Sequence, residues 1–584
     1  MKEEKPIGRK AVRQALAILA RYKAGKASLE RRMVENDLWY RMRHWQCLEN
    51  SHAVQPVSGW LFNCIANKHA EAMDNFPTAN ILPREENDRA EAAMLSAVIP
   101  AILERCDFEE VYSAVWDHKL RSGTGVFGVF WDSDAHRGLG DISIRRVDPI
   151  SLFWESGVTD IQASRNLFHV ELQDKEALIE RYPELANVPL ESPLEISRYC
   201  YDDTIDTESK AAVVDWYYKR FGKLHYCKFV GETVLYATEN DPLYASRGLY
   251  DHGLYPFLFD PLFRLEGTPC GFGYIDVGKS AQEFIDRGNQ AVMMNLLANA
   301  KPRYFFRSDG AVNEAEFADL SRDFIHVEGN LGSDSVQPVQ ASPLNSVYIQ
   351  AIQDKIEELK QTTGNRDVST GGTSGGVTAA SAIAAMQEAG SKLSRDTSRD
   401  AYRVYRRLIY MVIELLRQFY GLSRCFRIAG GFLRYGNRGL LPQHQGVANG
   451  VDLGWRVPEF DIRVTPQKQS PYSKASQNEL ALRLYDAGFF SPERRDEAAQ
   501  ALELMDFEGR HGLLAALGGR GPVSPGALAA KPPLCKGRCP EGAEGLSASD
   551  SVTIPQSASL TAPFTQGGLT EAVRRQTAEA AQPW

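Results

Sequence analysis

The stretch SVYIQAIQDKIEELKQTTGNRDVSTGGTSGG, residues 346–376, decides the fold, because a helical pattern gives way in it to a glycine-rich loop. Apolar residues recur every three or four positions and polar residues fill the opposite side, which predicts an amphipathic helix over 346–365. The apolar face comprises Ile349, Ile352, Ile356 and Leu359, and the polar face comprises Asp354, Glu357, Glu358 and Gln361. The glycines after Gly364 offer little apolar surface to bury, so residues 366–377 are predicted to form a mobile loop.

A second long helix is predicted before this stretch, over residues 271–300, and Pro302 ends it. One face comprises Val277, Ala281, Phe284, Gly288, Val292 and Leu296, and another comprises Lys279, Gln282, Asp286, Asn289 and Met293. Gly288 costs about 1 kcal/mol relative to alanine in a helix interior, which favours a close helix approach at this position.

Residues 301–345 separate the two helices and predict a small α/β module. Its strand-like runs are RYFFR (303–307) and FIHVEG (324–329), on either side of the helical run NEAEFADL (313–320). A third long helix is predicted over 378–420, with Thr378 as its cap and an apolar face at Tyr402, Tyr405, Leu408, Val412 and Leu415.

The first 265 residues predict a helical part followed by an antiparallel β-rich part. Residues 11–121 have helical periodicity, with breaks at Pro77 and Pro83. The β-rich runs are VFGVFWD, DISIRRVDP, SLFWE, NLFHVEL, AVVDWYYKRF, KLHYCKF and TVLYA. Gly222 and Gly231 mark turns between adjacent strands of a meander, which indicates an α+β fold and not alternating βαβ units.

The C-terminal part predicts a β-type connector, FRIAGGFLRYGN to FDIRVTP, and then two helices over 477–488 and 491–505. After residue 510 the sequence becomes rich in Gly, Ala, Pro and Ser, and it predicts a disordered tail over 511–584.

Charge and cysteine usage exclude several classes of protein. The chain has 66 Lys and Arg against 75 Asp and Glu, a formal charge of −9, so it lacks the basic excess of a protein that clamps DNA. Its nine cysteines are scattered without metal-ligand spacing, which predicts reduced thiols and no metal site. The most apolar helical run, LIYMVIELL (408–416), is too short to span a bilayer, so we expect no membrane segment.

Two short motifs suggest chemistry that their contexts disfavour. GTGVFG (123–128) matches the G-x-G-x-x-G dinucleotide pattern, but it follows a helical run and opens a strand, the reverse of the order that phosphate binding needs. GTSGG (372–376) matches the G-x-S-x-G elbow of serine hydrolases, with Ser374 as nucleophile and His444 downstream. The preceding NRDVST is polar and not an apolar strand, so a mobile loop is favoured, with a serine hydrolase as the alternative.

The order of elements resembles the portal proteins of tailed bacteriophages, and five stretches carry this resemblance. They are ILPREENDRAEAAMLSAVIPAILE, SGTGVFGVFWD, YPFLFDPLFRLEGTPCGFGYIDVGKSAQEFIDRGNQAV, VTAASAIAAMQEAG and AGFFSPERRDEAAQALELM. Similarity to this family implies a structural protein that is not an enzyme and needs no cofactor.

The resemblance implies a subunit with a wing, a two-helix stem, a clip and a tunnel loop. The wing would be 1–265, the stem helices 271–300 and 346–365, the clip 301–345, the tunnel loop 366–377, the long wing helix 378–420, and the C-terminal wing or crown 421–510. The residues expected to face DNA in the loop are Arg366, Asp367, Ser369, Thr370, Gly371, Gly372, Thr373, Ser374, Gly375 and Gly376. The stem residues expected to line the channel are Asp354, Glu357, Glu358 and Gln361, and the clip residues expected to face terminase or adaptor are Arg307, Asp309, Glu314, Glu316 and Asp319.

The family also implies the partners and the location. A portal assembles with itself into a ring, commonly a dodecamer, through which double-stranded DNA passes. Its other partners would be the terminase large subunit, a head-tail adaptor and the major capsid or scaffolding protein. The expected location is the portal vertex of the virion capsid, and the host cytoplasm during assembly.

Overall fold

The structure is a computed structural model of the 584-residue chain. It describes residues 7–48, 54–187, 210–300, 303–306, 313–319, 325–326, 336–339, 346–364, 392–428, 431–445, 447–448, 451–452, 454–468, 482–483, 486 and 488. The chain separates into two units, Met1–Ser473 and Lys474–Trp584. The first unit holds the helices and strands given below, and its mixture of many helices with small antiparallel sheets makes the fold α+β.

A five-stranded antiparallel sheet forms the meander that the sequence predicts. Its order is β4(Leu152–Trp154), β5(Asn166–Asp174), β6(Lys210–Arg220), β7(Lys223–Val230) and β8(Thr233–Ala237). Phe221 and Gly222 connect β6 to β7 with φ values of 50° and 74°, the two positive φ angles that a tight hairpin turn requires. Gly231, with φ 56°, turns the chain between β7 and β8, so both predicted turn glycines are confirmed.

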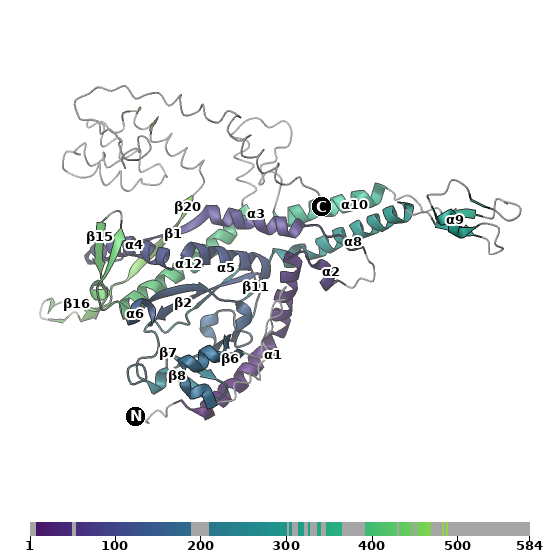
Figure 1. Ribbon diagram of the computed structural model, residues 1–584. Coiled ribbons are helices and arrows are strands. Elements are labelled where there is room, and N and C mark those ends of the chain that lie inside the picture. Colours follow the sequence, from purple (N-terminus) through teal and green to yellow (C-terminus); the bar gives the residue numbers. More distant parts are fainter. Residues whose placement is uncertain are drawn as a thin grey trace, which may run out of the picture. The chain divides into compact units, whose positions relative to one another are not determined.

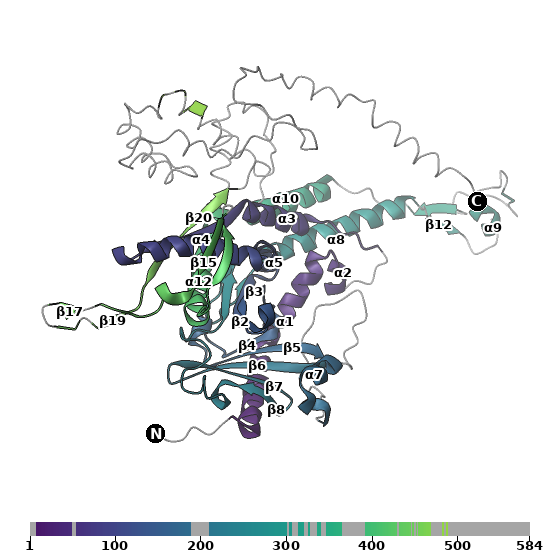
Figure 2. The same ribbon diagram turned by 60° about the vertical axis from the view of Figure 1, so that its left-hand side comes forward.

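The two faces of this sheet contribute to different cores because successive strand residues point to opposite sides. On β5, Phe168 and Val170 pack with Val12, Ala15 and Leu19 of α1(Arg9–Tyr40). Residues on the other face of the sheet, such as Leu167 of β5 and Tyr217 of β6, belong to the main core. Helix α1 therefore covers one side of the sheet, as Figure 2 shows.

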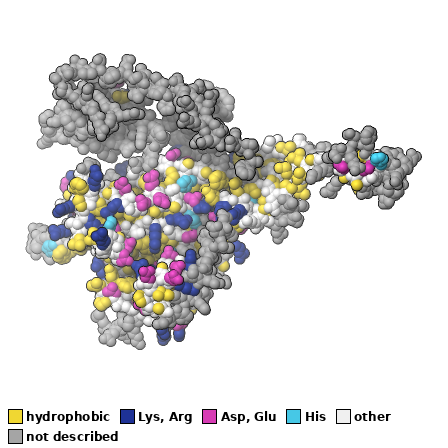
Figure 3. Space-filling view, viewed as in Figure 1, with side chains coloured by type: hydrophobic (Ala, Val, Ile, Leu, Met, Phe, Trp, Pro, Cys, Tyr) yellow, Lys and Arg dark blue, Asp and Glu magenta, His cyan; other side chains and the backbone are white. Residues whose placement is uncertain are grey.

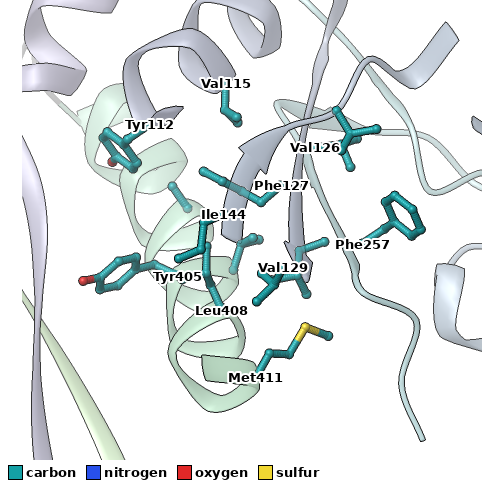
Figure 4. Close-up of a cluster of buried hydrophobic side chains, with 14 of the residues drawn as sticks. Tyr112, Val115, Val126, Phe127, Val129, Ile144, Phe257, Tyr405, Leu408 and Met411 are labelled. Atoms are coloured by element: carbon teal, nitrogen blue, oxygen red, sulfur yellow. The ribbon is translucent and has the colours of Figure 1, made fainter. Parts of the chain in front are cut away.

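A three-stranded sheet, in the order β3(Asp141–Arg146), β2(Thr124–Asp132) and β9(Phe257–Pro261), lies at the centre of the main core. Phe127 of β2 contacts the rings of Phe108 and Tyr112 on α5(Phe108–Ser122). Figure 4 shows Phe127 of β2 and Ile144 of β3 on the side of α12(Lys392–Phe419), near Tyr405 and Leu408, whereas Val126 of β2 and Phe257 of β9 lie on the other side of the sheet. Both faces of β2 are covered, which explains its nearly continuous buried pattern.

The expectation of a purely helical opening is wrong between α3(Trp60–Asp74) and α4(Arg89–Arg105). Residues Asn75–Pro83 form strand β1, which pairs over nine residues with β20(Phe460–Lys468). Pro77 lies opposite Pro466 in this two-stranded sheet, where neither proline removes a hydrogen bond needed by a third strand. The prolines that indicated helix breaks mark a strand whose partner lies far along the sequence.

The two long helices on either side of the insert are α8(Tyr274–Ala300) and α10(Ser346–Thr363), and both views in Figures 1 and 2 show them side by side. Their predicted positions are confirmed, except that Gly271 and Phe272 form strand β11. The described part of the third long helix, α12, ends at Phe419 as expected, whereas Thr378 and the predicted helices 477–488 and 491–505 fall mostly or wholly outside the described residues.

The remaining elements are short. They are α2(His44–Cys47), η1(Glu86–Asp88), α6(Ala135–Gly138), η2(Pro149–Ser151), η3(Ile161–Ala163), α7(Lys175–Arg181), η4(Pro183–Asn187), η5(Thr238–Asn240), β10(Phe263–Arg264), β12(Arg303–Phe306), α9(Glu314–Ala318), β13(Val336–Val339), β14(Arg424–Ile428), β15(Gly431–Tyr435), η6(Asn437–Gly439), β16(Gln443–His444), β17(Val447–Ala448), β18(Val451–Asp452) and β19(Trp455–Arg456). Within the described residues, no helix is both long enough and apolar enough to cross a membrane.

Candidate functional site

The pair of helices α8 and α10 is the first part of the candidate site. A Cβ atom placed on Gly288 of α8 would lie 2.8 Å from Cγ1 of Ile352 on α10, so only glycine permits this separation of the helices. The close approach predicted for Gly288 is therefore confirmed. Ile352 and Ile356 pack at the edge of the main core and Leu359 is buried in it, so the predicted apolar face of α10 packs at these three residues, whereas Ile349 is exposed.

The polar face of α10 points away from α8. Asp354, Glu357, Glu358 and Gln361 are all exposed. The hydrogen bonds of these side chains run along α10: Gln350 donates to Asp354 at 2.9 Å, Gln361 donates to Glu357 at 3.3 Å, and Lys355 donates to Glu358 at 2.6 Å. The three carboxylates span about 6 Å along the helix axis at 1.5 Å per residue. This surface, here called the acidic stem face, is the part of the predicted channel lining that the structure describes.

A buried polar cluster attaches α8 to the rest of the unit. Asp286 is completely buried, and its carboxylate contacts Nδ1 of His44 at 2.5 Å. The other carboxylate oxygen accepts hydrogen bonds from the backbone N–H and the hydroxyl of Ser58, at 3.1 and 2.9 Å, and from Gln282 at 3.0 Å. Nε2 of His44 lies 3.0 Å from the carbonyl oxygen of Trp39. The cluster thus joins α1, α2, the segment before α3, and α8.

The two faces that the sequence gives for α8 do not divide into one buried and one exposed. Gln282 and Asp286 from one face are fully buried, whereas Phe284 and Leu296 from the apolar face are 47% and 56% exposed. Beside the buried apolar side chains of Ile275 and Ile285, the helix packs through these hydrogen-bonded polar groups, which hydrophobic periodicity does not register. Figure 3 shows the resulting apolar side chains on the surface of the two helices. The exposed ones on α8 are Phe284, Met293, Met294, Leu296 and Leu297, and those on α10 are Val347, Tyr348 and Ile349.

The insert between α8 and α10 forms a small module around one hairpin. β12 pairs antiparallel with β13, and α9 follows Asn313, whose side chain accepts a hydrogen bond from the backbone N–H of Glu316. The expected strand FIHVEG is not a strand at its described residues, Ile325 and His326. His326 donates its backbone N–H to Glu316 at 2.8 Å, and this local contact replaces strand pairing there.

The structure describes the side chains of only two of the five predicted docking residues, Glu316 and Asp319. Asp319 is exposed, but the side chain of Glu316 is only 14% exposed and is held by His326. The expected contact of Glu316 with a partner stays a prediction, and in the subunit its carboxylate is bound to His326. Arg307 and Asp309 lie outside the described residues, as does the side chain of Glu314.

The predicted loop lies outside the described residues in its entirety. This applies to Arg366, Asp367, Ser369, Thr370, Gly371, Gly372, Thr373, Ser374, Gly375 and Gly376. His444, the expected partner of Ser374 in the hydrolase alternative, lies in β16 with its ring 5.3 Å from that of Trp455. No geometry for a nucleophile follows from these residues.

The G-x-G-x-x-G stretch is a helix-to-strand turn, as its context predicts. Gly123 ends α5 with φ 87°, and β2 begins at Thr124. A Cβ on Gly123 would lie 2.4 Å from the carbonyl carbon of Phe272, so the glycine serves both a positive φ angle and close backbone packing. The space that a phosphate would need is filled by the segment around Phe272.

Two sets of ionisable side chains in the interior hold neighbouring segments together through an ion pair and a hydrogen bond. Lys119 of α5 and Asp260 of β9, both at most 2% exposed, form a 2.8 Å ion pair that joins these two elements. Burial lowers the pKa of His252 to about 4, and its Nδ1 accepts the backbone N–H of Leu254 at 3.0 Å. Within the described part of the chain, no group of three or more His, Cys, Asp or Glu side chains has the arrangement of a metal site.

The chain matches a known protein family. A family model described as phage P22-like portal protein matches residues 71–229 and 221–525, which together cover well over half of the chain. No curated protein matches the chain.

Proposed function

The chain belongs to the phage P22-like portal protein family, and from that premise we propose how its parts build a DNA channel. A portal is a structural protein at a capsid vertex, where it provides the channel for viral DNA, and it is not an enzyme. Portal subunits form a ring and interact with the capsid and the terminase. The serine-hydrolase alternative on Ser374 is therefore set aside.

We assign the stem to α8 and α10 and the clip to the module between them. Two observations support this assignment beside the order of the elements. The two helices pack closely against each other at Gly288, and the chain between them forms a separate pair of strands and a short helix. The buried cluster at Asp286 fixes the start of this pair to the wing. A channel wall needs such attachment because force on DNA is transmitted to the capsid through the wing.

We propose that the acidic stem face lines the channel. Asp354, Glu357 and Glu358 would repel the phosphates of a passing duplex and keep it from adhering to the wall. This assignment agrees with the net charge of −9, which disfavours a static DNA clamp. The competing use of the same residues is in ion pairs with the adjacent subunit.

The loop 366–376 is proposed as the tunnel loop around DNA. Arg366 is its one cation, and we propose that it makes transient phosphate contacts that carry no sequence information. Pairing of Arg366 with Asp367 is the competing role. The ring is proposed to contain twelve subunits, with the clip facing first the terminase large subunit and later a head-tail adaptor. The capsid or scaffolding protein would contact the wing during assembly in the host cytoplasm.

The family match over residues 71–525 carries this proposal, and a charge-reversal experiment tests its channel part. The variant Asp354→Lys/Glu357→Lys/Glu358→Lys should still form rings but should package or release DNA more slowly, because the wall would attract phosphate. A control variant, Glu176→Lys/Glu180→Lys on exposed positions of α7, changes charge elsewhere. DNA passage at the normal rate through rings of the triple variant would show that these carboxylates do not face the channel.

A further inference from the structure

An arginine-rich surface lies along the exposed side of α12. We call it the arginine face, and it consists of Arg264, Arg395, Arg399, Arg403, Arg406 and Arg407, all exposed. Two carboxylates lie among them, and one of these, Asp400, pairs with both Arg403 at 2.5 Å and Arg264 at 3.3 Å. The side chains of Arg399, Arg406 and Arg407 have no ion-pair partner among the described residues. Positive charge therefore exceeds negative charge along about three turns of α12.

The arginine face borders a pocket of about 570 Å³ between α12 and the β9–β11 segment. Arg264, Arg403 and Arg407 line it together with apolar residues such as Leu258, Pro261, Val404 and Met411. A surface of this composition, cations around an apolar floor, is typical of a protein interface more than of a phosphate-binding surface.

A second surface on the same chain has the opposite charge. A groove of about 1010 Å³ lies where β1 meets the ends of α4 and α5, and it is here called the acidic groove. The carboxylates that line it are Asp74, Glu104, Asp107, Glu109 and Glu110, all exposed. None of them has a hydrogen-bond or ion-pair partner through its side chain among the described residues, and no Lys or Arg lines the groove. Its apolar floor includes Phe76, Ile99 and Leu103.

Helix α12 separates the two surfaces. The pocket at the arginine face is lined by Asp400, Val404, Arg407 and Met411, which share one side of the helix. Tyr405, which lines the acidic groove, points about 140° away from Asp400 on the helical wheel at 100° per residue. The two surfaces are therefore on different sides of the subunit, as a repeating head-to-tail contact requires.

We propose that the arginine face of one subunit docks on the acidic groove of the next, and that this contact closes the portal ring. The inference rests on the ring assembly of the proposed function and names the surfaces that make it. A contact between two different surfaces of identical chains repeats around an axis and closes when the rotation allows. The partner is a second copy of this chain, because one chain carries both a surface with an excess of positive charge and a surface with an excess of negative charge, each with an apolar floor. Complementary charge then sets the orientation of neighbouring subunits.

Two charge-reversed variants test this contact. The first is Glu104→Lys/Glu109→Lys in the groove, and the second is Arg399→Glu/Arg407→Glu on the arginine face. Glu104 lies in the last turn of α4 and Glu109 in the first turn of α5, so the effects of the two lysines on the helix dipoles oppose each other. Glu176→Lys/Glu180→Lys on α7 is the matched control, with one change in the first turn and one near the helix end.

Each variant alone should lose at least tenfold in ring yield by negative-stain imaging and native mass spectrometry, because like charges would meet at every contact. An equimolar mixture should recover rings that contain both variants in equal numbers, since a reversed groove fits a reversed face. The control should assemble like the wild type. The milder Glu104→Gln/Glu109→Gln should raise the protein concentration for half-assembly about tenfold.

Failure of the docking proposal and failure of the proposed ring function give different results. The docking proposal is wrong, while the ring function stands, if the wild type forms rings and either charge-reversed variant also forms them alone. The same holds if the mixture of the two variants fails to form rings while the glutamine variant assembles normally. If the arginine variant forms normal rings that no longer retain DNA, the arginine face serves nucleic acid and the proposal is again wrong. If the wild type itself never forms rings, the proposed function fails before the docking question arises.

Discussion

Replacing Asp286 by alanine tests how the stem is attached to the wing. The carboxylate is fully buried and faces His44, Ser58 and Gln282, so its removal leaves a buried imidazole and a backbone N–H without their acceptor, while the Gln282 amide still donates to Ser58. Each buried polar group left without its partner costs about 1–3 kcal/mol, so the total is about 3–5 kcal/mol, because the remaining polar groups stay desolvated. We expect Asp286→Ala to lower the free energy of unfolding of the unassembled subunit by that amount.

Phe284, two residues away on the same helix, supplies the comparison. Complete burial would make Phe284→Ala cost about 3–5 kcal/mol, but the side chain is 47% exposed, so the expected loss is about 1–2 kcal/mol. Asp286→Asn keeps an oxygen that accepts from Ser58 and Gln282 and loses the charge opposite His44, and its effect should lie between the other two. Equilibrium urea denaturation of the unassembled variants measures all three.

The relative sizes of the losses in the free energy of unfolding show whether polar or apolar contacts hold α8. A loss for Phe284→Ala that equals or exceeds that for Asp286→Ala would mean that α8 is held by its apolar face after all. The polar cluster would then be incidental to the attachment of the stem.

Three further predictions concern the glycine contact, acid stability and the loop. Gly288→Leu should separate α8 from α10 and lower the free energy of unfolding by about 1–3 kcal/mol, because the larger side chain overpacks against Ile352. The double variant Gly288→Leu/Ile352→Ala should recover part of this loss. Equal urea midpoints for Gly288→Leu and the wild type would contradict the contact. His252, with its pKa lowered to about 4 by burial, stays neutral in the folded chain while the unfolded chain takes up a proton below about pH 6.5, so stability should fall by ~2–3 kcal/mol as pH drops from 6.5 to 4. His252→Asn should flatten that pH dependence, and an unchanged slope would assign it to other groups. Deletion of residues 371–376 should leave ring assembly intact and impair DNA packaging or retention, whereas loss of rings would show that the loop is needed for assembly.

The strands of the body could be predicted from the sequence because local patterns specify them. Short runs rich in β-branched and aromatic residues between positions 166 and 237, with the turn glycines Gly222 and Gly231, were enough to give the meander. Strand β1 could not be predicted in this way, since its prolines resemble helix breaks and its partner β20 begins at Phe460. Pairing over such a separation is a tertiary effect that no local window contains.

The candidate site was predictable in part for the same reason. The acidic stem face follows from helical spacing and is exposed as expected. The buried role of Gln282 and Asp286 was missed, because a helix that packs through hydrogen bonds has no apolar signature. His44 and Asp286 lie far apart in the sequence, and only the fold brings them together. The acidic groove likewise combines residues of α3, β1, α4, α5 and α12, so its charge emerges only in three dimensions.

Imaging of the purified, full-length protein tests the central claim most directly. Negative-stain electron microscopy, supported by native mass spectrometry across a range of protein concentrations, should show rings of identical subunits around a central channel. A protein that stays monomeric at every concentration and salt condition, while folded by circular dichroism, would contradict the account of this chain as a ring-forming portal.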